Sequence, residues 1–230
     1  MAAAENSLPR VSASTSLDDS RGLVLKQAAN ELVFAVVGHV GSGTSEIAEA
    51  LEERLTEDTL EGGAFELKVL KAREVIKEWA TEHREAHPGD AKNLTSTERY
   101  QDLGDLMRAE KTTDGEHNYP AVARRLVLKI REARALSLGI PLESTPQPIA
   151  PDGKRRAFIL DSIRHPAEVH LLRHIYQDAF VQIGVVCEES RRLERLRIKY
   201  KEAGDTALHT FMERDARAEA LHARAAAVDQ

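Results

Sequence analysis

One feature constrains this chain most: an apolar run that leads into a glycine-rich turn and then into a helical pattern. Residues 32–37 read LVFAVV, which is too continuously apolar for a strand with one solvent-facing side and therefore predicts a strand buried on both faces. The glycine loop, residues 38–43, follows, and apolar spacing predicts a helix over 44–55. A strand, a glycine loop and a helix in this order are typical of a phosphate-binding loop in an α/β sheet.

Residues 38–45, GHVGSGTS, match the phosphate-loop pattern G-x-x-x-x-G-K-S/T except that Thr44 stands in the lysine position. Glycines let such a loop turn its N–H groups around an anion, and the helix adds its N-terminal dipole. Ser45 is placed to ligate Mg²⁺. The predicted nucleotide contacts are Gly38, His39, Val40, Gly41, Ser42, Gly43, Thr44 and Ser45. Because the lysine neutralises charge in phosphoryl transfer, its absence predicts binding with little catalysis. A glycine turn without any ligand is the alternative.

A second candidate for the same site ends the short apolar run at 158–160. The run closes on Asp161, where a carboxylate at the end of a parallel strand could hold Mg²⁺ through water. Alternatively, Asp161 caps the turn before a helix that begins near Pro166. Arg164 could meet a phosphate at the same strand edge, or pair with Glu168 at helical spacing.

The segment 191–201, RRLERLRIKYK, is strongly basic. Its Arg191 and Arg195 lie at i and i+4 and therefore share one face of a helix. Guanidinium groups grip phosphate oxygens through paired hydrogen bonds, so both arginines are candidates for a lid over a bound nucleotide. The alternative is a solvated helix whose charge is balanced by neighbouring glutamates.

Alternating strand and helix patterns predict one α/β fold, a doubly wound, mostly parallel sheet in three layers. Beyond the first strand, the predicted strands span 65–70, 158–160 and 180–186. The domain organisation is a disordered tail over 1–29, a nucleotide-binding domain over 30–204 and a C-terminal helix over 205–230.

Composition excludes several other classes of protein. With 42% hydrophobic and 30% charged residues, the chain reads as globular. It has no apolar run long enough for a membrane span and no secretory signal, which predicts a cytoplasmic location. A net charge of −6 argues against a nucleic-acid surface. The single cysteine, Cys187, rules out the two-cysteine zinc site of a cytidine deaminase, so no zinc is expected.

Four segments together resemble a known family: GHVGSGTS, RYQDLGDLMR (99–108), FILDSIRHPAEVHLLRHIY (158–176) and VQIGVVCEESRRLERL (181–196). They resemble the N-terminal P-loop region of bacterial anti-phage dCTP deaminases. They are also similar to the wider nucleoside monophosphate kinase superfamily, whose members carry a D-[SG]-x-R-x-P-x-E-V stretch. The resemblance implies a P-loop, kinase-like fold that binds ATP, GTP or a deoxynucleoside triphosphate with Mg²⁺. In the deaminase family this region also lacks the lysine, and a separate zinc domain, absent from this chain, depletes dCTP.

Three hypotheses follow. The first is a regulatory or sensing nucleotide-binding domain that acts with a cytidine deaminase-type domain or subunit. The second is an active nucleoside monophosphate kinase that uses Mg-ATP, and the third is an interaction scaffold with an empty loop. On the first hypothesis, an apolar stripe that begins with Leu208, Phe211 and Met212 should be uncovered on the final helix. Alternatively, these residues pack on the chain's own sheet.

Overall fold

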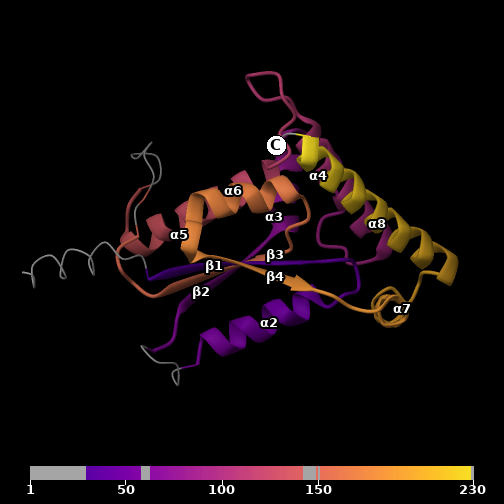
Figure 1. Ribbon diagram of the computed structural model, residues 1–230, viewed down its shortest axis with the longest axis horizontal. Coiled ribbons are helices and arrows are strands. Elements are labelled where there is room, and N and C mark those ends of the chain that lie inside the picture. The colour runs from indigo at the N-terminus through magenta and orange to yellow at the C-terminus, as the bar shows by residue number, and fades with distance from the viewer. Residues whose placement is uncertain (1–29, 58–62, 142–148, 150, 229–230) are drawn as a thin grey trace, which may run out of the picture.

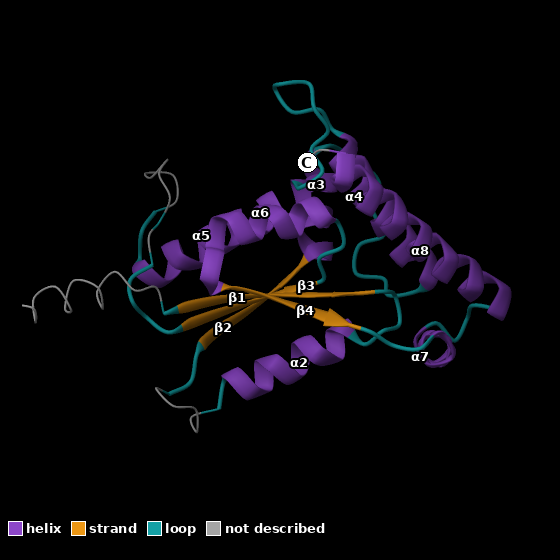
Figure 2. Ribbon diagram, viewed as in Figure 1, coloured by secondary structure: helices purple, strands orange, loops and turns teal. Residues whose placement is uncertain are grey.

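The computed structural model describes residues 30–57, 63–141, 149 and 151–228, with side chains up to Arg217. The tail predicted over 1–29 lies outside the described residues. Four strands form one parallel sheet in the order β2-β3-β1-β4 (Figure 2). Their bounds are β1 (Glu31–Gly38), β2 (Glu66–Lys71), β3 (Arg156–Asp161) and β4 (Phe180–Val185).

Helices cover both faces of the sheet, which confirms the predicted doubly wound α/β fold (Figure 1). One face carries α2 (Thr44–Leu55), and the other carries α3 (Ala72–Glu82), α5 (Ala121–Leu138) and α6 (Pro166–Tyr176). The helix α4 (Leu94–Ala109) packs on α3 and α5. A short 3₁₀ helix, Gln177–Ala179, joins α6 to β4. After β4 come α7 (Glu189–Lys199) and α8 (Asp205–Val228), beyond the carboxyl ends of the strands.

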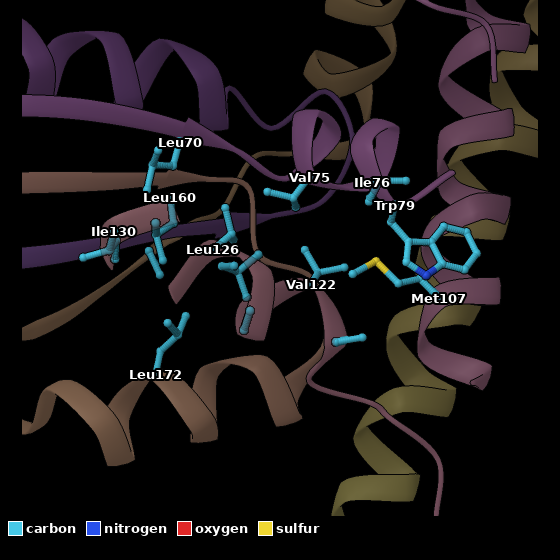
Figure 3. Close-up of a cluster of buried hydrophobic side chains, with 14 of the residues drawn as sticks. Leu70, Val75, Ile76, Trp79, Met107, Val122, Leu126, Ile130, Leu160 and Leu172 are labelled. Atoms are coloured by element: carbon cyan, nitrogen blue, oxygen red, sulfur yellow. The ribbon is translucent and has the colours of Figure 1, made fainter. Parts of the chain in front are cut away.

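The alternation of side chains along β1 explains why both faces are covered. Val33 and Ala35 enter the larger core, while Phe34 and Val36 enter the smaller core under α2. Figure 3 shows the larger core, where side chains of β2 and β3 meet those of α3, α5 and α6. A central strand buried on both sides is what the unbroken apolar run 32–37 predicted.

A third apolar cluster joins the glycine loop to the C-terminal helices. Leu208, Phe211 and Met212 of α8 are buried, and they pack with Val40 of the loop and with Leu196 of α7, among others. The prediction that these three residues form an uncovered stripe is therefore wrong. The alternative, that these residues pack on the chain's own sheet, is also wrong, because they pack on the glycine loop and α7.

The topology reverses direction at β1. The helix after β1, α2, lies on one face of the sheet, and the helix after β3, α6, lies on the other. In open parallel sheets, ligands bind outside the carboxyl ends of the strands at such a switch point. Here those ends carry Gly38 and Asp161, on the neighbouring strands β1 and β3.

Candidate functional site

The glycine loop places an uncapped helix N-terminus at the switch point. Gly41 and Gly43 have φ values of +77° and +97°, in the left-handed region that favours glycine. Gly43 is the N-cap of α2, and no side chain caps this helix. The loop is closed by a hydrogen bond of 3.0 Å from the Ser42 N–H to the His39 carbonyl. The first N–H groups of α2 therefore lack intrahelical partners and, with the helix dipole, can bind an anion.

Each glycine of the loop allows a different close approach. A Cβ on Gly38 would lie 2.5 Å from Ser42 Oγ, inside the loop itself. One on Gly41 would lie 2.8 Å from the carbonyl oxygen of Arg192, and one on Gly43 would lie 2.3 Å from Nη1 of Arg195. The Ser42 hydroxyl is buried and has no hydrogen-bond partner among the described residues. The loop thus has close packing around it and an unpartnered polar atom within it.

Ser45 and Asp161, the two residues predicted to hold Mg²⁺, lie together. Ser45 Oγ donates a hydrogen bond of 3.2 Å to Asp161 Oδ2. Burial raises the pKa of the Asp161 carboxyl above its ordinary value, against smaller lowering effects of this hydrogen bond and of Lys71. One carboxylate and one hydroxyl suit Mg²⁺, which keeps several waters. The alternative role for Asp161 is wrong, because His165 caps α6.

No zinc-like constellation occurs in the part of the chain that the structure describes: it contains no group of three His, Cys, Asp or Glu side chains able to share a metal ion. Serine is outside that set of ligands, so the Ser45–Asp161 pair is a separate kind of site. An oxygen-only pair fits a hard divalent cation better than it fits zinc.

Asp215 of α8 contacts two residues of the glycine loop. Its buried carboxylate accepts a hydrogen bond of 2.8 Å from the Val40 N–H and lies 3.3 Å from His39 Nδ1. It also forms an ion pair with Arg164. Arg164 therefore lies beside the loop, and its contact with a phosphate stays a prediction. The predicted side-chain pair of Arg164 with Glu168 is wrong, because the Glu168 carboxylate pairs with Arg108 and receives only the backbone N–H from Arg164.

Asp215 was missed from the sequence. It lies 175 residues from Val40 along the chain, in a helix whose own pattern gives no signal of that contact.

The basic helix α7 brings one of the two predicted arginines to the loop. Arg195 donates a hydrogen bond of 2.9 Å to the Ser42 carbonyl and pairs at 2.9 Å with Glu46, in the first turn of α2. Arg191 is exposed, and no hydrogen bond or ion pair within the described ranges joins it to the loop. Among the described ion pairs, none joins an arginine of α7 to a glutamate of the same helix.

Arg192 anchors α7 against the loop and was not predicted as a site residue. It is buried, and its Nε donates a hydrogen bond of 2.9 Å to the Val40 carbonyl. Its Nη2 is buried without a hydrogen-bond partner among the described residues. The signal that could have found it is its position four residues before Leu196, on the apolar face of the helix.

A shallow hollow of about 640 Å³ lies elsewhere, at the start of α4 and the α7–α8 turn. Its lining includes Glu98 and Glu202 and none of the loop residues. Two carboxylates there would repel a polyphosphate. The two carboxylates of the hollow and the unpartnered donors beside the loop therefore favour the glycine loop as the site for an anion.

No family model matches the chain, and no curated protein matches it. Among solved structures, a chain in "Structure of the Pnkp1/Rnl/Hen1 RNA repair complex" is similar at a TM-score of 0.36 and 11% identity. The match covers 82% of this chain and 46% of the other, so this chain spans less than half of that protein's length. A similarity this low bears on neither fold nor function. Within the described residues, no helix has both the length and the apolar character that a membrane span needs.

Proposed function

We propose that this chain binds a nucleoside di- or triphosphate together with Mg²⁺, with the phosphates in the glycine loop. The observation that carries the proposal is the contact of 3.2 Å between Ser45 and Asp161, beside an uncapped helix N-terminus. The loop and the first turn of α2 supply N–H groups to the phosphate oxygens. Ser45 and Asp161 supply oxygens to the metal.

The phosphates and the metal, rather than the base, are what these residues recognise. ATP, GTP and the deoxynucleoside triphosphates share the triphosphate, so all of them are candidates. A binding or sensing role is favoured over phosphoryl transfer because Thr44 offers a hydroxyl where a lysine would follow the transferring phosphate. A link to a deaminase partner rests on the sequence resemblance alone. Because Leu208, Phe211 and Met212 are buried, such a partner would need another surface.

Phosphotransfer to a nucleoside monophosphate is the second candidate, and the position of Arg195 favours it. Its guanidinium contacts the loop at the Ser42 carbonyl and brings a positive charge near the missing lysine. Steady-state turnover of ATP with each nucleoside monophosphate separates the two candidates. We expect turnover far below the range of about 1 to 100 per second that is typical of kinases. Sustained turnover within that range would establish the second candidate instead.

Thermal unfolding with a panel of ribo- and deoxyribonucleotides, with and without Mg²⁺, tests binding. A ligand at 100 times its Kd adds about 2.7 kcal/mol to the unfolding free energy, which raises the Tm of a domain of this size by roughly 5 to 10 °C. The response should require Mg²⁺ and should be lost in Gly43→Val, whose side chain would meet Arg195.

Gly115→Val is the matched control for that variant, since Gly115 also has a positive φ but has open space around it. Each variant is compared with its own nucleotide-free Tm, so that lost stability is not mistaken for lost binding. A wild-type protein that responds to no nucleotide, or a Gly43→Val protein that responds fully, would contradict the proposal.

A further inference from the structure

The loop lacks a positive charge of its own at the lysine position. Thr44 has a short side chain, and its Cγ2 would lie 3.0 Å from a Cβ on Gly38, so it turns back toward the base of the loop. A bound triphosphate would bring several negative charges to this place. The N–H groups and Mg²⁺ offset part of that charge, and a mobile cation beside the terminal phosphates is missing from the loop sequence.

We propose that Arg195 of α7 supplies this cation, reaching the outer phosphates of a bound nucleotide in place of the lysine that Thr44 replaces. The inference rests on the proposed function and names the residue that makes the loop selective for di- and triphosphates. Nη1 of Arg195 donates a hydrogen bond of 2.9 Å to the Ser42 carbonyl. The same atom lies 2.3 Å from the position of a Cβ on Gly43, next to residue 44.

Of the two described arginines that form ion pairs beside the loop, Arg195 is the one whose carboxylate partner is open to solvent and can be exchanged for a ligand. Arg164 pairs with Asp215, whose side chain is only 4% exposed, so releasing it would leave a buried carboxylate without its partner. Arg195 pairs with Glu46, whose side chain is 65% exposed. Solvent-exposed ion pairs contribute little to stability, so a polyphosphate can displace Glu46 from Arg195 at a small cost in free energy.

Contacts between α7 and the glycine loop hold Arg195 at this position. Arg192 Nε bonds to the Val40 carbonyl, and Gly41 lets the backbone of α7 approach the loop. The Nη2 of Arg192 and the hydroxyl of Ser42, both in residues at least nine-tenths buried, have no hydrogen-bond partner among the described residues. Buried donors without partners beside an accessible guanidinium indicate that this junction accepts an anion. The contacts of α7 with the loop thus place an arginine, in place of a lysine carried by the loop, beside residue 44.

Calorimetric titration with Mg-ATP, and with inorganic triphosphate plus Mg²⁺ as a base-free probe, tests the assignment. Arg195→Ala should weaken the binding of both probes by about 10- to 100-fold, the range for a lost hydrogen bond to a charged group. Arg197→Ala is the control, because it removes a guanidinium from the same helix that pairs with Asp205 instead. It should bind both probes as the wild type does.

Two further variants keep the test independent of folding. Thr44→Lys in the Arg195→Ala background should restore most of the lost affinity, because the cation returns from the loop side. Glu46→Gln removes the competing carboxylate from an exposed position and should strengthen triphosphate binding several-fold.

The outcomes separate the two proposals. If wild-type protein binds and Arg195→Ala binds equally well, or if Glu46→Gln changes nothing, the role of Arg195 is overturned and nucleotide binding stands. If wild-type protein binds neither probe, the proposed function itself fails.

Discussion

Gly41→Ala tests how closely α7 approaches the glycine loop. Gly41 has a φ of +77°, and an alanine there would pay the strain of the left-handed region, about 1 kcal/mol. Its Cβ would also lie 2.8 Å from the Arg192 carbonyl oxygen and 3.1 Å from Leu196 Cγ. The first neighbour is a backbone atom, so α7 must shift, and overpacking of this kind costs about 1 to 3 kcal/mol more. The expected total is about 2 to 4 kcal/mol.

Urea unfolding measures this loss as a lower midpoint at an unchanged slope. Gly115→Ala measures the backbone strain without the overpacking, because Gly115 has a φ of +82° and nothing within 4 Å of its Cβ position. It should cost only about 1 kcal/mol. Equal losses of unfolding free energy in the two variants would contradict the close approach of α7 to Gly41. They would also contradict the packing of α7 that places Arg195 beside the loop.

Two other substitutions test the two carboxylates that contact residues 38–45. Burial raises the folded-state pKa of Asp161 above its ordinary value of 3.8, so its charged form opposes folding at neutral pH and this cost fades as the pH falls toward 3.8. Asp161→Asn should therefore raise the unfolding free energy at pH 7 by about 0.5 to 2 kcal/mol, with a smaller gain in unfolding titrations at lower pH, while Mg²⁺-dependent nucleotide binding is lost. A gain that grows on acidification would contradict the assigned cause. Asp215→Asn should lower the unfolding free energy by about 1 to 3 kcal/mol, because it weakens the buried hydrogen bond from the Val40 N–H and breaks the ion pair with the partly exposed Arg164. A loss below about 1 kcal/mol in urea unfolding would mean that Asp215 does not organise the loop.

The sequence predicted the sheet and the closeness of Ser45 to Asp161 because both depend on local patterns. The apolar run before Gly38 and the short run before Asp161 each indicated a buried strand. Carboxyl ends of parallel strands meet at one edge of a sheet. Hence Ser45 and Asp161 could be expected to lie together although 116 residues separate them.

What the sequence could not predict is how the C-terminal helices fold back over the loop. The contact from Val40 to Asp215 depends on the angle between α7 and α8, and no periodicity encodes that angle. The same fold-back buries Phe211, which the helical pattern alone left open to either outcome. Helical spacing placed Arg191 and Arg195 on one face, but only the loop contacts distinguish them.

The most direct test of nucleotide binding at the glycine loop is to follow backbone amide resonances during a titration with Mg-ATP. The account predicts that the largest shift changes fall on Gly43, Thr44 and Ser45, whose N–H groups begin α2. Smaller changes should follow on Arg195 and Asp161. Changes confined to the hollow around Glu98 and Glu202, or no changes with any nucleoside triphosphate, would contradict the account.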